Sequence, residues 1–120
     1  IAARHAQDAL GLGRVAIVDW DVHHGNGTEA VFRGDDSVLF VSLHQWPFYP
    51  GTGGPGTGDA TTLNLPLPAG TGDAEYLDVF ATVVEPAVAV QFLSRQSFSA
   101  AMAGSTRKPR ATYEPVPRSG

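Results

Sequence analysis

Two carboxylates and two imidazoles fall within one short run of the chain, D-W-D-V-H-H-G-N-G at residues 19–27. Side chains two residues apart on an extended backbone point the same way, so Asp19, Asp21 and His23 could converge on one ion. Carboxylate oxygen and imidazole nitrogen together suit zinc or another divalent transition metal. A lone Asp-x-Asp pair is common in solvated turns, but the whole run is much more specific. It therefore predicts a metal site.

The run follows a short apolar segment, V-A-I-V at residues 15–18, which predicts a strand buried on both faces. Residues 38–41, V-L-F-V, predict a second such strand, and residues 27–33 between them predict a short helix capped by Thr28. Two buried strands joined by a helix predict a βαβ unit in a parallel sheet. Ligands bind beyond the carboxyl ends of such strands, which is where residues 19–27 and 42–44 fall.

Other segments extend this α/β pattern. Residues 1–10 predict the end of a helix that Gly11 stops, and residues 45–62 form a Gly/Pro-rich loop long enough to be functional. Residues 63–68 predict an extended edge segment, because their two prolines exclude a central strand. Asp73 is expected to cap a helix reaching about residue 88, and Pro86 is expected to kink or end it.

Composition excludes several classes of function. The net charge of −4 argues against a nucleic-acid-binding surface, and the absence of cysteine excludes disulfides and cysteine-ligated metals. No apolar run has membrane length and no signal peptide opens the chain, so no membrane partner and a cytoplasmic setting are expected.

Three motifs in order resemble the histone deacetylase superfamily: V-D-W-D-V-H-H-G-N-G-T-E from residue 18, V-S-L-H from residue 41 and F-Y-P-G-T-G from residue 48. The group includes bacterial histone deacetylase-like amidohydrolases and acetylpolyamine amidohydrolases, and the likeness covers about residues 1–88. Asn26 resembles the class II-like branch. The likeness implies an arginase-like α/β fold with a parallel sheet, of which this chain holds only the central part. It also implies hydrolysis of N-acetyl amides, with an acetylated lysine side chain or an acetylpolyamine as substrate.

The resemblance assigns site roles position by position. Asp21 and His23 match two of three zinc ligands, while Asp19 and Asn26 match the partners that orient a catalytic pair of histidines. In the mechanism that it implies, zinc polarises the acetamide carbonyl and activates a water, whose proton a histidine accepts.

The resemblance also implies a structural potassium ion and an acyl-group channel. The potassium ligands that it implies are Asp19, Asp21, His23, Ser42 and Leu43. The channel and rim residues that it implies are Phe48, Tyr49 and Gly51.

Essential parts of the family pattern have no counterpart in the chain. No Asp or His follows Asp78, so the third zinc ligand is missing, as are the paired histidines and the catalytic tyrosine. We therefore expect the isolated chain to be inactive. Two alternatives stay open: a non-catalytic remnant that binds metal weakly, and an unrelated Asp-x-Asp enzyme such as a manganese-dependent nucleotide-sugar transferase.

A boundary is expected near residue 90. Residues 91–120 hold five of the eight basic residues but one of the twelve acidic ones, and hydrophobic periodicity fades there. The sequence thus predicts a partial deacetylase domain over residues 1–90 and a disordered tail outside the family pattern over residues 91–120. A frameshift or a mis-called gene end near residue 90 would explain this change.

Overall fold

The computed structural model of the chain describes residues 1–92, and the predicted disordered tail lies almost wholly outside this range. Among the described residues, no helix has both the length and the apolar character needed to cross a membrane. The elements, in chain order, are α1 (Ala2–Leu10), β1 (Val15–Asp19), α2 (Asn26–Phe32), β2 (Val38–Gln45), β3 (Thr62–Leu67), α3 (Asp73–Val79), the π-helical η1 (Phe80–Val84) and α4 (Glu85–Phe92).

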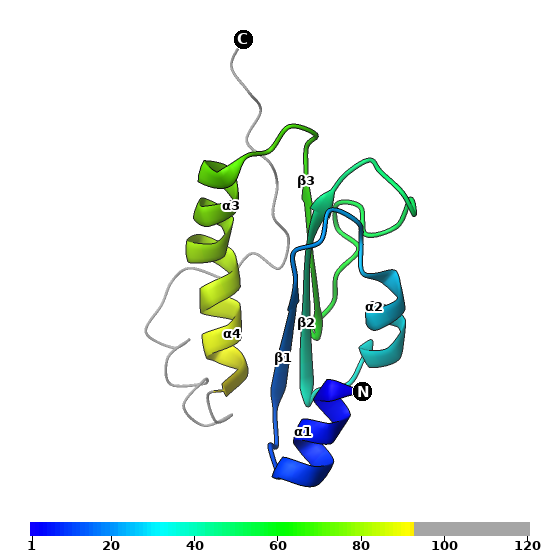
Figure 1. Cartoon of the computed structure of the whole chain (residues 1–120), viewed down its shortest axis with the longest axis vertical. Coiled ribbons are helices and arrows are strands. Elements are labelled where there is room, and N and C mark those ends of the chain that lie inside the picture. Colours follow the sequence, from blue (N-terminus) through cyan, green and yellow to red (C-terminus); the bar gives the residue numbers. More distant parts are fainter. Residues whose placement is uncertain (93–120) are drawn as a thin grey trace.

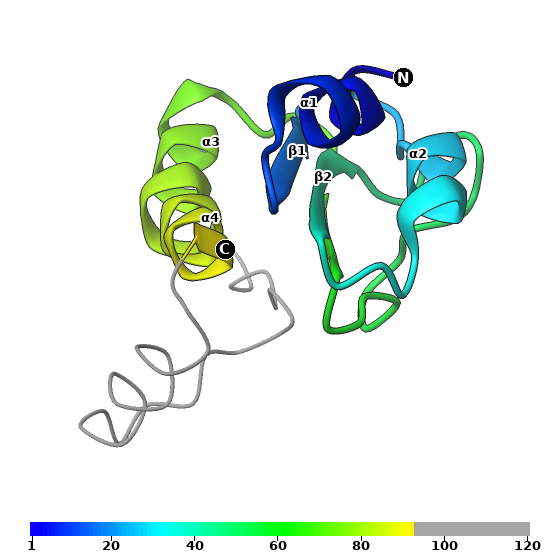
Figure 2. The ribbon, with the colours of Figure 1, turned by 90° about the horizontal axis from the view of Figure 1, so that it is seen from below.

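The strands form a parallel three-stranded sheet in the order β1-β2-β3. Helices α1 and α2 lie on one side of the sheet, and α3, η1 and α4 run along the other side (Figures 1 and 2). The predicted α/β fold with a parallel βαβ unit is therefore confirmed.

Alternation along β2 and β3 divides their side chains between two layers. Odd-numbered residues of both strands pack against the helical rod formed by α3, η1 and α4. This larger core comprises Leu39, Val41, Leu43, Leu63, Leu65, Leu67, Val79 and Val84. A smaller core on the opposite face contains Val38, Ala3 and Phe32. Toward the carboxyl ends of the strands this second face turns polar, with Ser42, His44 and Asn64 all buried. The sheet thus carries a polar floor where the metal site is predicted.

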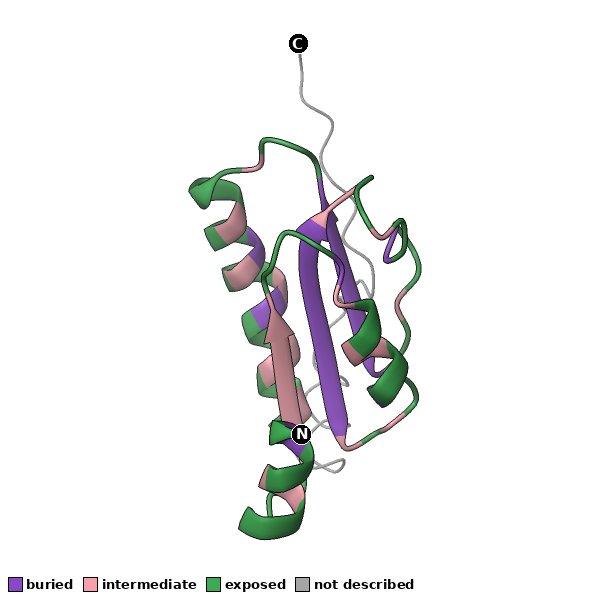
Figure 3. Cartoon of the chain, turned by 45° about the vertical axis from the view of Figure 1, so that its right-hand side comes forward, coloured by how far each residue is buried: buried purple, intermediate pink, exposed green. Residues whose placement is uncertain are grey.

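Of the two outer strands of the described sheet, β1 differs from its prediction and β3 agrees with it. β1 is half-buried rather than buried on both faces, whereas β2 is almost fully enclosed (Figure 3). The reason is that β1 pairs only with β2, so its other edge is open in the described part of the chain. Within residues 1–92, β3 also pairs only with β2, so it lies at the edge of the described sheet, as expected from Pro66.

The predicted helix caps need correction. α2 begins at Asn26 after Gly25, so Thr28 lies inside the helix and does not cap it. Likewise Gly72, not Asp73, precedes α3, and its N–H donates to Glu75 Oε2 at 3.2 Å. The prediction for α1 holds, since Gly11 ends that helix in a left-handed conformation with φ of 68°.

Of the two outcomes predicted for Pro86, a kink or an end of the helix, the structure contradicts the end. Pro86 is the second residue of α4, and the helix continues to Phe92. The π-helical turn η1 lies directly before it and changes the hydrogen-bond register. Proline has no backbone N–H, so in a regular α-helix the carbonyl four residues before it would lose its partner. The change of hydrogen-bond register falls on the turn that contains this carbonyl.

Candidate metal centre

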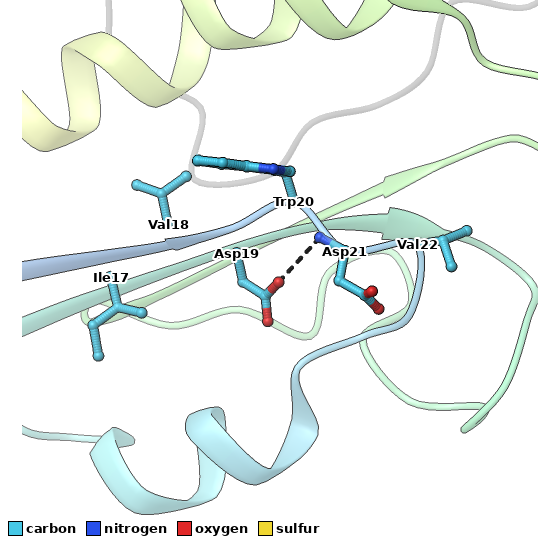
Figure 4. Close-up of a pocket in the computed structure, with 6 residues that line it drawn as sticks. All are labelled: Ile17, Val18, Asp19, Trp20, Asp21 and Val22. Atoms are coloured by element: carbon cyan, nitrogen blue, oxygen red, sulfur yellow. Dashed lines mark hydrogen bonds between the residues drawn. The ribbon is translucent and has the colours of Figure 1, made fainter. Parts of the chain in front are cut away.

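The predicted metal-binding run leaves the sheet at the carboxyl end of β1, where Asp19 lies beside Ser42 in the strand register. The carboxylates of Asp19 and Asp21 project to the same side of the chain, while Trp20 projects to the other and packs edge-on against Phe80 (Figure 4). An open pocket is lined by residues 17–22. The alternation expected from an extended backbone therefore continues past the end of the strand.

Asp21 and His23 form the most direct candidate for metal binding. Their atoms Oδ1 and Nδ1 lie 3.0 Å apart, and the side chains are 64% and 47% exposed. The His23 backbone N–H also donates to Asp21 Oδ1 at 2.8 Å. Hydrogen bonds from the backbone and then the ring of His23 lower the pKa of Asp21, so the carboxyl is ionised.

These two residues fit part of a zinc ligand set. A carboxylate oxygen and an imidazole nitrogen are ligand types that zinc prefers, and here they are adjacent and accessible. Within residues 1–92, however, no group of three or more His, Cys, Asp or Glu side chains could hold a metal ion. The described part of the chain therefore offers two ligands, where a catalytic zinc site ordinarily uses three from the protein.

Asp19 is held differently from Asp21. Its Oδ1 accepts a hydrogen bond from the Asp21 N–H at 3.1 Å, and its Oδ2 lies against Gly25. A Cβ at position 25 would stand 2.5 Å from that oxygen and 2.9 Å from the Phe40 ring, so only glycine allows this approach. The Gly25 N–H in turn reaches Ser42 Oγ at 3.3 Å.

The remaining predicted site residues fall in distinct environments. Ser42 is fully buried close to Gly25, while the Leu43 side chain packs in the larger core. Asn26 is exposed at the start of α2. The potassium and orienting roles of these residues stay predictions.

The loop of residues 46–54, which we call the aromatic loop, brings two of the predicted channel residues to His23. The Phe48 ring stacks on the His23 ring with centroids 5.3 Å apart, and the Tyr49 ring meets it edge-on at 6.1 Å. Gly51 closes a tight turn by donating its N–H to the Phe48 carbonyl at 2.8 Å, with φ of 84°. Both aromatic side chains remain exposed.

Beneath this surface lies a buried polar network that sequence reasoning missed. His24 Nε2 donates to Glu29 Oε2 at 2.8 Å and also lies 3.1 Å from Asn64 Oδ1, while Nδ1 forms a 2.8 Å hydrogen bond with Thr52 Oγ1. Burial raises the pKa of Glu29, but hydrogen bonds from Asn64, Arg33 and His24 outweigh it and leave the pKa lowered. Glu29 is therefore an anionic centre joining α2, β3 and the metal-binding run.

His44 completes the network. Its Nε2 donates to the Gly53 carbonyl at 2.8 Å, and its Nδ1 lies 3.0 Å from Ser42 Oγ. Burial lowers the pKa of His44, and the neutral ring accepts a hydrogen bond from the Ser42 hydroxyl at Nδ1. The signal for this network was the appearance of polar residues at even positions in the apolar strands, Ser42 and His44 in β2 and Asn64 in β3.

A parallel α/β sheet with a carboxylate–imidazole pair beyond its carboxyl edge defines an α/β protein with a candidate metal centre. A family model described as the histone deacetylase domain matches residues 1–92. The chain belongs to the histone deacetylase family. This membership argues against the unrelated Asp-x-Asp enzyme.

Similar proteins include deacetylases from several kingdoms. A probable deacetylase of Archaeoglobus fulgidus is 53% identical over 65% of this chain and 23% of its own length. Histone deacetylase 14, chloroplastic, of Arabidopsis thaliana is 53% identical over 72% of this chain and 22% of its own length. The polyamine deacetylase HDAC10 of Rattus norvegicus is 47% identical over 72% of this chain and 16% of its own length.

Solved structures agree with the sequence comparison. The crystal structure of the HDA15 HD domain superposes with a TM-score of 0.63 at 47% identity, covering 71% of this chain and 27% of that domain. The structure of the histone deacetylase Clr3 gives 0.66 at 42% identity, covering 74% of this chain and 17% of the other. The chain thus has the histone deacetylase fold, but it spans about a quarter or less of the proteins it matches.

Proposed function

We propose that this chain is the ligand-bearing segment of a zinc-dependent deacetylase that hydrolyses N-acetylated amines. The observation that carries the proposal is the Asp21–His23 pair, whose Oδ1 and Nδ1 atoms lie 3.0 Å apart beside the aromatic loop. Family membership supports deacetylation as the reaction, and similarity to named histone and polyamine deacetylases supports an acetylated lysine side chain or an acetylpolyamine as substrate.

Each element of this site has a separate task. Asp21 and His23 would hold the zinc ion, which when bound supplies polarisation of the substrate acetamide carbonyl. Phe48 and Tyr49 are exposed beside His23 and offer apolar ring surface to the aliphatic stem of the substrate. The substrate has an uncharged acetamide on an aliphatic stem, which suits contact with these apolar rings.

The isolated chain should bind zinc weakly and turn over negligibly. Only two ligands are offered among the described residues. The resemblance to the family assigns no residue of the chain to the catalytic pair of histidines. His24 and His44, the buried histidines nearest the site, are already committed to Glu29, Thr52 and Gly53.

Calorimetric titration with Zn²⁺ tests the ligand assignment. We expect Asp21→Asn and His23→Ala each to weaken zinc binding by on the order of tenfold or more, because each removes one of two ligands. The matched controls are His5→Ala and Asp8→Asn, exposed residues of α1 near the amino ends of the strands. Zinc binding that survives in His23→Ala would refute the assignment.

An activity assay tests the second part of the proposal. The chain is incubated with Zn²⁺ and either an acetyl-lysine peptide or an N-acetylated polyamine, and released acetate is measured. No zinc-dependent release above the protein-free blank is expected. Robust turnover would show that residues 1–120 contain a complete catalytic site and would overturn the proposed incompleteness.

A further inference from the structure

Gly53 sits between the two buried imidazoles in a position that admits no side chain. Its φ is 76°, and a Cβ there would stand 2.6 Å from both the His24 ring and His44 Nε2. The two ring centroids lie only 4.7 Å apart. The backbone of the aromatic loop therefore passes between the two imidazole rings. Glycine is required there because the φ is positive and because no side-chain atom fits between the rings.

Two consecutive loop residues are each bound by a different imidazole. Thr52 Oγ1 bonds His24 Nδ1 at 2.8 Å, and the Gly53 carbonyl accepts from His44 Nε2 at 2.8 Å. We call these four residues the latch: His24, His44, Thr52 and Gly53. The latch fastens the loop to the metal-binding run through one histidine and to β2 through the other.

Both histidines are themselves anchored. The remaining nitrogen of His24 is engaged by Glu29 and Asn64, and that of His44 by Ser42. His24 is 5% exposed and His44 is fully buried. A buried, fully hydrogen-bonded polar cluster is costly to rearrange, so the latch offers the loop one well-defined position.

The latch lies close in sequence to both partners of the aromatic stack. His24 directly follows the ligand candidate His23, and Thr52 follows the turn in which Gly51 bonds the Phe48 carbonyl. We infer that the latch is a positioning device for the proposed site. It holds Phe48 and Tyr49 against His23 and does not itself contact the metal ion or the substrate. Its histidines are positioning residues rather than catalytic ones.

This inference rests on the proposed function for the meaning of the aromatic surface, but its geometry can be tested without metal or substrate. A purely structural role for the Thr52 hydroxyl would lower stability when it is removed and leave the Phe48–His23 stack in place. A positioning role would displace the stack in the folded protein. The two outcomes differ in a spectroscopic quantity, the ring-current shift that Phe48 imposes on the His23 ring protons.

The experiment records the His23 ring protons by NMR in the full, zinc-free chain. Phe48→Leu gives the shift without stacking. Thr52→Val removes the hydroxyl at nearly constant shape and should move the His23 shifts more than half of the way to the Phe48→Leu values. Thr52→Ser keeps the hydroxyl and should restore the wild-type shifts. The matched control is Thr71→Val, which removes a hydroxyl that donates to the Pro68 carbonyl at 2.6 Å in an exposed turn.

Wild-type shifts in Thr52→Val, or displaced shifts in Thr52→Ser or Thr71→Val, would overturn the inference. Thr52 is exposed, so folded variants are expected, and Thr52→Ala supplies the same loss of hydroxyl should Thr52→Val not melt cooperatively. Because no zinc is present, a failure of the zinc assignment leaves this result unaffected. Conversely, a latch that fails this test leaves the calorimetric test of Asp21 and His23 intact.

Discussion

At the scale of single residues, the buried hydroxyl of Thr62 lowers the stability of the fold. The side chain is 1% exposed, and its Oγ1 has no hydrogen-bond partner among residues 1–92. A buried, unpaired hydroxyl is destabilising relative to an apolar group of the same shape. We predict that Thr62→Val raises the free energy of unfolding by about 1 kcal/mol, measured by urea denaturation followed by circular dichroism.

The neighbouring residue provides the control for that change. Thr61 Oγ1 accepts from the Gly34 N–H at 3.0 Å and donates to Asp59 Oδ1 at 3.0 Å. Thr61→Val should therefore lower stability, although the two substitutions are chemically identical. A loss of stability in both variants would show that the Thr62 hydroxyl is satisfied.

Residue types and spacing predicted part of the site. Alternation placed Asp19 and Asp21 on one side, and the structure agrees. Alternation could not predict that the two carboxylates differ in environment. The turn at Gly25 brings the backbone against the Asp19 carboxylate and leaves the Asp21 carboxylate exposed. The contact between His24 and Thr52 was equally inaccessible, since it joins positions 28 residues apart through a loop without a regular pattern.

At the scale of elements, the turn between α2 and β2 depends on one carboxyl group. Asp35 Oδ1 accepts from the Ser37 hydroxyl at 2.6 Å and the Ser37 N–H at 2.9 Å, and Oδ2 accepts from Arg4 at 2.7 Å. These bonds, those from Ser37 foremost, lower the pKa of Asp35 from 3.8 to about 2. Because the folded state lowers this pKa, the stabilisation is present above about pH 4 and is lost as the pH falls toward 2.

We therefore predict that Asp35→Asn lowers the melting temperature at pH 7, and that its difference from wild type shrinks as the pH falls from 4 to 2. Thermal melts at a series of pH values measure this. Asp8→Asn, at an exposed position on α1, is the control and should change the melting temperature little at any pH. A difference for Asp35→Asn that is constant down to pH 2 would contradict the assigned role of the carboxylate.

The prediction of single elements failed where tertiary packing outweighed the local preference of a residue. Local sequence rules correctly predicted the strands, the end of α1 at Gly11 and the edge position of β3. They failed for Pro86, because the rod that contains it packs against the sheet through Val79, just before the π-helical turn, and through Val84, the last residue of that turn. Burial of that face keeps the rod continuous where an isolated helix would break at the proline.

At the scale of the whole molecule, the described chain has one strongly held strand. β2 pairs with β1 on one side and β3 on the other, and its residues from Val38 to His44 are all buried. β1 pairs on one edge only and is half-buried, and α1 buries Ala3 alone. The floor of the site, Ser42 and His44, thus lies on the strand expected to be most stable, while the ligand candidates leave the sheet from a less protected one.

Hydrogen exchange followed by NMR would measure this gradient directly. Backbone amides of β2 should exchange most slowly, with protection approaching that of global unfolding, because this strand is paired on both edges and is buried from Val38 to His44. Amides of β1 that face its open edge should exchange faster than those bonded to β2, and α1 should exchange fastest among the helices. Protection in α1 equal to that in β2 would contradict this hierarchy. Exchange at the unfolded rate throughout residues 1–92 would show that the chain does not hold this sheet by itself, and the histone deacetylase fold would then require sequence beyond it.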